Sequence, residues 1–431
     1  MTVPALLAEL RARDIRVWVD GDQLKVNAVA GTLTPELREQ LRQRKGEVLK
    51  FLCGPAELSF AQQRLWFLDQ MEMVSTAYVI PLAMRIQGPL QAGALEGALG
   101  SIVMRHESLR TTFANTEGRP VQNVSAVASF SLPVVEVSGE PGRLGALMSE
   151  EMNRGFNLAH GPLFRAVLYR LRPEEHVLLL LQHHIISDAW SLDVMLRDLG
   201  TLYRDRVSGR VSTLPEWPVQ YRDFARWQRE WLQGGVLIHQ LEYWRAQLAG
   251  APQVLELPTD RPRPPMESHR GAIFMFSIPR EVSAGFGGLA RREGTTLFMA
   301  LMAAFDVLLW RYTGQEDLLV GIPVSNRRRK ELEGLIGNFV NTLVVRGDLS
   351  GNPTVQELLA RVRERCLDAY AHQELPLEAL VEDLRPARDL SRNPLIQVIL
   401  DLQNVPPPSF AAPGLTVTPF EVDRGAVHLD I

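Results

Sequence analysis

The sequence predicts a mixed α/β protein in which a small unit of helix, two strands and helix precedes a larger α/β body. Near the N-terminus, hydrophobic residues change from helical spacing to strict alternation and back. Gly54 and Pro55 interrupt the pattern, and the later run 176–182 has the continuous apolar character of a buried strand. With 431 residues the chain is long enough for several cores, and we expect domains at 1–53, 54–245 and 246–431.

Composition excludes several classes of function. The chain is 46% hydrophobic and 22% charged with a net charge of −4, as in ordinary globular proteins. The slightly acidic balance argues against a nucleic-acid partner. No apolar run approaches the roughly 20 residues of a membrane span, and no signal peptide is evident, so we expect a cytoplasmic protein without a membrane partner. Two cysteines form neither a disulfide framework nor a zinc site.

The first 53 residues show helical spacing, then strand alternation, then helical spacing again. Residues 6–10 have helical spacing, and residues 15–19 and 24–26 alternate on either side of an Asp-Gly-Asp turn, which predicts a hairpin. Thr34 and Pro35 then have the pattern of an N-cap and a first helical residue. Fifty residues are marginal for independent stability, so we expect this unit to dimerise or to pack against a partner.

Proline-rich segments divide the larger body. Residues 257–265 contain too many prolines for a helix or a central strand and predict a connection between two lobes. The second lobe is expected to open with a strand at 272–278, followed by a deeply buried helix at about 297–312. Residues 405–413 predict another connection before a final strand.

The candidate site lies where the buried strand ends. The apolar run 176–182 leads directly to His183 and His184, and helical spacing resumes after Asp188 with Ser191 as the expected N-cap. A neutral imidazole in a strand-to-helix connection can accept the proton of an attacking amine or alcohol. The alternative is a histidine pair that only caps a buried strand. We predict no metal, because adjacent histidines point in different directions and no third ligand is nearby.

The body resembles the condensation domain of nonribosomal peptide synthetases over residues 58 to 431. Seven motifs occur in the family's order, namely 58–66 (LSFAQQRLW), 105–113 (RHESLRTTF), 183–191 (HHIISDAWS), 221–227 (YRDFARW), 336–342 (IGNFVNT), 372–378 (HQELPLE) and 388–395 (RDLSRNPL).

This resemblance implies the fold and the reaction. The fold would be a pseudo-dimer of two chloramphenicol-acetyltransferase-like lobes in a V shape, with a tunnel between them. The reaction would be amide-bond formation by an acyltransferase between a donor acyl or peptidyl thioester and an acceptor aminoacyl thioester. Upstream and downstream carrier proteins would deliver both on phosphopantetheine arms, which are substrates and not covalently bound cofactors.

The resemblance also implies the roles of individual residues. His184 would be catalytic, as a general base or by positioning the amine, and His183 would hold the loop. Asp188 would pair with Arg327, which occupies the family's position for a loop-anchoring arginine. The neighbourhood of the site would include Ser187, Ala189, Trp190 and Asn341.

Residues 1–53 resemble the TubC-type docking domain found at the start of synthetase subunits. This implies capture of the C-terminal docking peptide of an upstream subunit. The hairpin residues Val17, Val19 and Leu24 would offer a strand edge to that peptide, and Arg16 and Lys25 would contact its acidic residues.

Two departures from the family pattern leave alternatives open. Ala189 replaces the glycine of the family's HHxxxDG motif, so the methyl group is either tolerated, restrictive, or the sign of a catalytically impaired platform that recruits partners. The chain stops at Ile431 inside what resembles a strand, so we expect the second lobe to be incomplete at its C-terminus. A related epimerase, heterocyclase or soluble acyl-CoA acyltransferase is a further alternative. Heterocyclases place Asp where this chain has His183, and epimerases differ in the flanking motifs, which here match condensation domains. The flanking motifs favour the subtype that joins an L-configured donor to an L-configured acceptor.

Overall fold

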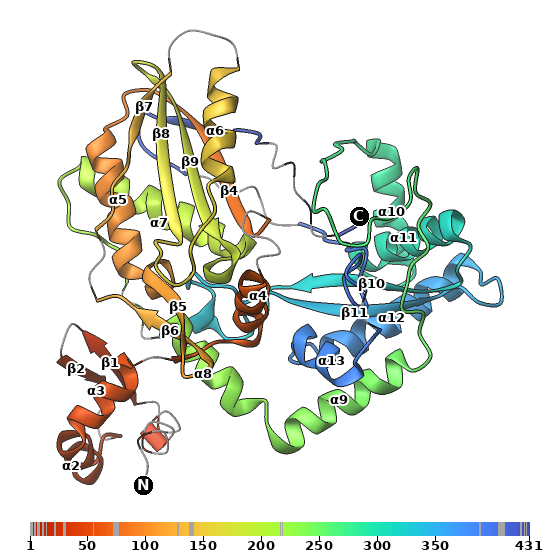
Figure 1. Cartoon of the computed structure of the whole chain (residues 1–431), viewed down its shortest axis with the longest axis horizontal. Coiled ribbons are helices and arrows are strands. Elements are labelled where there is room, and N and C mark those ends of the chain that lie inside the picture. The colour runs from red at the N-terminus through yellow and green to blue at the C-terminus, as the bar shows by residue number, and fades with distance from the viewer. Residues whose placement is uncertain are drawn as a thin grey trace. The chain divides into compact units, whose positions relative to one another are not determined.

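Figure 1 shows the computed structural model of the chain. It describes all residues except 1–2, 4–5, 7–8, 11–12, 14, 21–22, 29–31, 55, 72–76, 127–128, 138–141, 216, 218, 388, 404–409, 423–424, 426 and 428, and except the side chains of 16, 18–20 and 50–53. The chain forms two compact units. Unit 1 contains 1–229, 327–338 and 408–422, and unit 2 contains 230–326, 339–407 and 423–431. The predicted lobe boundary at 245 stays a prediction.

The N-terminal segment of unit 1 has the expected strand–strand–helix order, and the first predicted helix lies largely outside the described residues. Strands β1 (Arg16–Asp20) and β2 (Gln23–Asn27) form an antiparallel hairpin. The predicted last helix is two helices, α2 (Pro35–Gln43) and α3 (Lys45–Cys53), separated at Arg44. Thr34 caps α2 by accepting a hydrogen bond from the Leu37 amide at 3.4 Å. The segment has a hydrophobic cluster of its own, with buried Val3, Leu6, Leu10, Ile15, Leu37, Leu41 and Val48.

In the rest of unit 1 the described strands form two sheets, which are accompanied by several helices. The larger has the order β12-β4-β9-β8-β7, with β4 (Val79–Gln87), β7 (Val134–Glu136), β8 (Phe164–Arg172), β9 (Glu175–His183) and β12 (Thr416–Pro419). The smaller has the order β3-β6-β5, with β3 (Ala56–Glu57), β5 (Thr111–Thr116) and β6 (Arg119–Val124). The helices are α4 (Phe60–Gln70), α5 (Ala92–Arg105), α6 (Arg143–Asn153) and α7 (Ala189–Val207), with the 3₁₀ turns η1 (Glu107–Arg110) and η2 (His184–Ile186). Helix α8 (Tyr221–Trp231) ends as the chain passes into unit 2.

Strand β9 confirms the predicted buried strand. It lies between β4 and β8 and is antiparallel to both (Figure 1). Its apolar residues 177–181 have no exposed surface. Because β9 is paired with both neighbours along its length, its end is held in place. The backbone position of the next residue, His184, is therefore restricted.

Unit 2 is built around a second strand pair. Strands β10 (Asp317–Val324) and β11 (Asn341–Asp348) are antiparallel, and Gly321 forms a parallel bridge with Ile399. The helices are α9 (Gly234–Leu248), α10 (Arg280–Arg292), α11 (Leu297–Thr313), α12 (Val355–Ala371) and α13 (Leu377–Leu384), and η3 (Lys330–Leu332) lies in the part of unit 1 that follows β10.

Two predictions for unit 2 are wrong. Residues 272–278 form neither a strand nor a helix, and Phe274 is 85% exposed. The backbone hydrogen bonds in this region instead join Gly271 to Gly425 and Val427 to His269, just before the apolar segment, which has no strand partner among the described residues. Helix α11 is present as expected, but it is not buried all round, since Leu308 is 50% exposed.

One buried acid of α11 is unusual. Asp306 is fully buried, and neither carboxylate oxygen has a hydrogen-bond partner in the described part of the chain. Burial raises the pKa of Asp306 to about 8. The carboxyl group is therefore expected to hold its proton at neutral pH.

No single described helix is both long and apolar enough to span a membrane. Helices α10 and α11 meet that test only together, and they are bent by 110° with respect to each other.

Candidate active site

The predicted histidine pair lies on a tight turn between β9 and α7. Strand β9 ends with His183, the 3₁₀ turn η2 holds His184 to Ile186, and α7 begins at Ala189. The His184 amide donates a hydrogen bond to the Tyr78 carbonyl at 2.8 Å, directly after the β4–β9 ladder. The Ser187 amide donates to the His184 carbonyl at 3.3 Å, which closes the turn. The backbone of His184 is thus fixed on both sides, and its side chain is half-buried.

His183 holds this turn as a neutral acceptor. Its ring is buried, and Nδ1 accepts a hydrogen bond from the Ile185 amide at 3.1 Å. Burial, with a smaller contribution from His184, lowers the pKa of His183 to about 3. The ring is therefore neutral at physiological pH, and its proton must lie on Nε2, because Nδ1 is already an acceptor.

Asp188, not Ser191, is the N-cap of α7. The Asp188 carboxylate accepts from the Ser191 amide at 2.8 Å, and the prediction that Ser191 would cap the helix is wrong. The helix begins three residues earlier than the hydrophobic spacing indicated, since Ala189 and Trp190 form its first turn. The positive pole of the helix dipole also stabilises a carboxylate at this end of the helix.

Asp188 also forms the ion pair with Arg327. The Arg327 Nη2 atom lies 3.1 Å from Asp188 Oδ1 and 3.3 Å from Oδ2, and both side chains are almost completely buried. Arg327 Nη1 donates to the carbonyls of Leu332 and Leu335 at 2.6 and 2.8 Å. Burial lowers the pKa of Arg327, and the charge of Asp188 opposes that shift. One guanidinium therefore ties the start of α7 to the 327–338 segment.

Ser191 completes this network, and sequence reasoning missed its role. Its hydroxyl is fully buried and accepts hydrogen bonds from Arg327 Nη2 at 2.9 Å and from the Gly337 amide at 3.0 Å. Asp188 Oδ1 at 2.7 Å and the Gly337 carbonyl at 2.9 Å compete for its single proton. Its place at the end of the 183–191 motif was the available signal, but the partners lie 136 and 146 positions away in the sequence.

The remaining predicted neighbours flank the turn. Ser187 is buried, and Ala189 and Trp190 are exposed. The Trp190 Nε1–H group donates to the Glu333 carbonyl at 2.8 Å, which adds a second link to the 327–338 segment. Ala189 is the first residue of α7 and is absent from the residues with positive φ, so its backbone does not need glycine and its methyl group is exposed.

Asn341 belongs to unit 2 and organises a loop there. Its amide nitrogen donates to the carbonyls of Gln373 and Leu375 at 2.9 and 2.8 Å, and its oxygen accepts from the Leu377 amide at 3.1 Å. The side chain therefore fixes the segment between α12 and α13. Both polar atoms of its side chain form hydrogen bonds with backbone groups, as is typical of a structural residue.

The docking residues lie on the hairpin. Val17 and Leu24 are half-buried against the cluster of the N-terminal segment, and Lys25 is half-buried on β2. The side chains of Arg16 and Val19 lie outside the described residues. Since this sheet has two strands, each strand has one edge without a strand partner in the described part of the chain.

No group of three histidine, cysteine or acidic side chains that could hold a metal ion occurs among the described residues.

Comparison with known proteins gives the family. The condensation-domain model matches residues 54–424, and the model of the TubC N-terminal docking domain matches residues 3–53. The chain belongs to the condensation-domain family. More particularly, it is a condensation domain of the nonribosomal peptide synthetase type preceded by a docking domain, as the seven motifs implied.

Three relatives illustrate the match. Over 375 residues the chain is 47% identical to one of the proteins that make up the linear gramicidin synthase of Brevibacillus parabrevis, covering 86% of the chain and 5% of that protein. Over 437 residues it is 43% identical to a probable non-canonical nonribosomal peptide synthetase of Salinispora arenicola, covering 99% of the chain and 6% of that protein. The crystal structure of the X-domain from teicoplanin biosynthesis matches with a TM-score of 0.81 and 31% identity, over 88% of the chain and 84% of that structure. The chain thus spans about a twentieth of the length of the two synthetases.

Proposed function

We propose that this domain joins a donor acyl or peptidyl thioester to an acceptor aminoacyl thioester, with His184 at the reacting centre. The observation that carries the proposal is the fixed turn: the second histidine of the HHxxxD segment follows a buried strand and precedes a helix whose start is clamped by Asp188, Ser191 and Arg327. A rigid support of this kind is what a positioned catalytic group requires.

The reaction needs one proton acceptor or orienting group. The acceptor nitrogen attacks the donor carbonyl carbon, a C–N bond forms and the C–S bond breaks. The donor pantetheine leaves as a thiol with the proton that the amine loses. We infer that His184 orients the amine, takes up this proton as the C–N bond forms, and passes it to the departing sulfur. His183 is unsuited to that step at neutral pH, because its pKa is about 3 and its Nδ1 atom is engaged by the Ile185 amide.

A condensation assay with loaded donor and acceptor carrier proteins tests this proposal. We expect His184→Ala to lower the rate of amide formation at least about 100-fold, the usual contribution of a positioned general base. His239→Ala, on an exposed histidine of α9, is the matched control and should keep wild-type activity. Unchanged product formation by the His184 variant would contradict the catalytic role.

The same assay decides whether the domain is an impaired platform. The exposed position of Ala189 and its ordinary helical backbone support an active domain, because neither strain nor a buried clash accompanies the methyl group. No product from the wild-type chain with several carrier pairs would favour the platform instead.

We also propose that residues 1–53 bind the C-terminal docking peptide of an upstream subunit, so that the donor carrier arrives on another polypeptide. The strand edges of the hairpin and the cationic Lys25 on β2 support this proposal. Deleting residues 1–53 should slow donor delivery from the upstream subunit but spare small soluble thioester donors. Lys25→Glu should weaken docking, whereas Lys45→Glu on an exposed position of α3 should not. Equal loss with both kinds of donor would contradict docking. A cytoplasmic location and dimerisation through this segment remain part of the proposal.

A further inference from the structure

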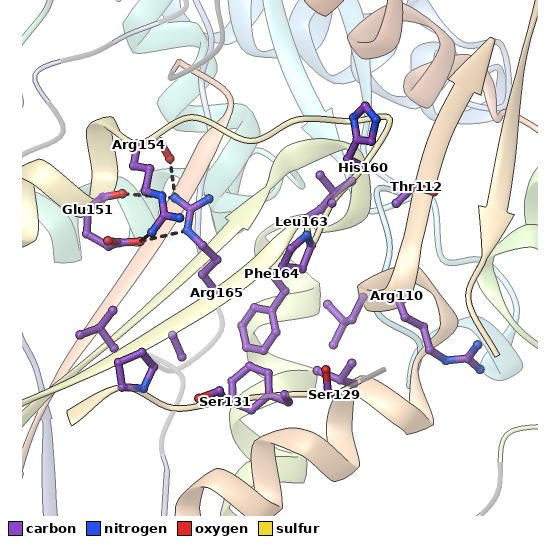
Figure 2. A pocket seen from close by; sticks show the side chains of 18 of the residues that line it. Arg110, Thr112, Ser129, Ser131, Glu151, Arg154, His160, Leu163, Phe164 and Arg165 are labelled. Carbon is purple, nitrogen blue, oxygen red and sulfur yellow. Dashed lines mark hydrogen bonds and ion pairs between the residues drawn. The ribbon is translucent and has the colours of Figure 1, made fainter. Parts of the chain in front are cut away.

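A cavity lies in unit 1, and none of the proposed catalytic residues lines it. Its volume is about 850 Å³. Figure 2 shows it between β8, which carries Phe164 and Arg165, and the segment that carries Ser129 and Ser131. Arg110 lies at one end, and Glu151 with Arg154 lies at the other. Nothing in the proposed condensation reaction uses this space.

One wall of the cavity is an open strand edge. Strand β7 pairs with β8 only at residues 168–170. There the Leu168 amide donates to the Pro133 carbonyl, and the Arg170 carbonyl accepts from Val137, both at 2.9 Å. Because backbone groups alternate sides along a strand, those of Phe164 and Ala166 point the same way. Within the described ranges no strand pairs with this edge, and both residues line the cavity.

Arg110 brings a positive charge to one end of the cavity. Its side chain is 13% exposed, and Nη1 donates to the Ser125 carbonyl. The nearest carboxylate, Glu107, lies 3.8 Å away and is closer to Arg222, at 2.9 Å. The partly exposed guanidinium therefore places a positive charge at this end of the cavity, which favours a ligand that carries a negative group.

The opposite end of the cavity has balanced charges by contrast, with Glu150 and Glu151 beside Arg154 and Arg165. Arg165 Nε donates to Glu151 at 3.0 Å, and its other groups donate to backbone carbonyls, including that of Gly155 at 3.1 Å. Arg110 is therefore the residue expected to determine the charge of the ligand that binds. Between the two ends the lining is mainly apolar, with Leu109, Phe130, Pro133, Leu147, Leu163, Phe164 and Val167.

We propose that this cavity binds a short acidic segment of a partner protein in extended conformation, as an added strand along residues 163–167 of β8. Backbone groups of the segment pair with Phe164 and Ala166. A carboxylate of the segment accepts from Arg110, and apolar side chains at alternate positions contact the apolar lining. Strand addition of this kind takes its affinity from the backbone and its selectivity from the side-chain contacts.

Fluorescence anisotropy with the full chain tests the proposal. The probe is a fluorescein-labelled, C-terminally amidated peptide Val-Thr-Val-Asp-Val. We expect saturable binding, at least ten-fold weaker binding of the peptide with Lys in place of Asp, and loss of binding when alternate backbone nitrogens are methylated. Ser131→Trp, on an exposed residue that lines the cavity, should weaken binding at least ten-fold. Ser208→Trp, on an exposed residue outside the cavity, should not.

Three results would overturn the proposal. One is no saturable binding at about 1 mM peptide. Another is equal affinity for the Asp and Lys peptides or for the methylated peptide, a comparison that needs no protein variant. The third is displacement of the probe by dodecanoate at lower concentration than by unlabelled peptide, which would make the cavity an acyl-chain site. Condensation activity of Ser131→Trp separates this proposal from the catalytic one, because that variant should keep the activity with soluble donors.

Discussion

Asp188→Asn is the most informative single substitution in the proposed active site. Asparagine keeps the shape of the side chain and an oxygen that can still cap α7, so the change removes the negative charge and little else. The side chain of Arg327 is 1% exposed, and its charge would then lie buried without its carboxylate. The two hydrogen bonds of Arg327 to the carbonyls of Leu332 and Leu335 would remain and would offset only part of that cost.

The expected loss of stability follows from this burial. Removing one partner of a buried ion pair costs about 3–5 kcal/mol, because the other charge stays desolvated. We expect Asp188→Asn to lower the free energy of unfolding of unit 1 by that amount. Arg327→Met should cost a similar amount, whereas the double variant should lose less than the sum of the two by at least about 1.5 kcal/mol.

Urea unfolding monitored by circular dichroism, with hydrogen exchange of the α7 amides to assign the change to unit 1, measures these values. A matched substitution, Asp193→Asn on the same helix but outside the ion pair, should change stability by less than about 0.5 kcal/mol. A loss below about 1 kcal/mol for Asp188→Asn, or strictly additive effects in the double variant, would refute the view that the pair is desolvated and coupled.

Three further predictions rest on buried polar groups. Ser191→Ala should cost about 1–3 kcal/mol in urea unfolding, since the Gly337 amide loses its acceptor, and Thr in its place should restore part of the loss. The folded-state pKa of His183, about 3, lies below the unfolded value of about 6.5. Its contribution to stability is therefore complete above pH 6.5 and falls by up to about 1.4 kcal/mol per pH unit toward pH 3, a slope that His183→Asn should lack. The folded-state pKa of Asp306, about 8, lies above its unfolded value, so stability falls as the pH rises from about 4 to about 8. Asp306→Leu should stabilise the chain by at least about 2 kcal/mol at pH 7.5 and by much less at pH 4, and an equal gain at both values would contradict a buried neutral acid.

Much of the candidate site could be predicted because its signals are local. The apolar run before His183 specified a buried strand, and the helical spacing after Asp188 specified a helix, so the histidines had to lie on the connection. The pairing of Asp188 with Arg327 came from resemblance to a family. No local pattern links two residues that are 139 positions apart.

The failures have physical causes that a local pattern does not contain. Residues 272–278 are nearly all apolar and resemble a strand, but a strand forms only when another strand supplies backbone partners, and none does so in the part of the chain that the structure describes. The N-cap of α7 was placed at Ser191 because serine is a common capping residue. Asp188 caps the helix instead. The Ser191 hydroxyl accepts hydrogen bonds from Arg327 and from the Gly337 amide, which belong to a distant segment of the chain.

The path of the chain through the two units has a consequence for synthesis on the ribosome. The helix start that supports His184 is complete only when residues 327–338 are in place, and the five-stranded sheet gains β12 only with residues 416–419. Nearly a hundred residues of unit 2, 230–326, are translated before the first of these segments. We therefore expect unit 1 to complete its folding only after most of the chain has left the ribosome, because Asp188 and Ser191 lack their distant partners until then. In pulse-labelled nascent chains, resistance of α7 to proteolysis should accordingly appear late.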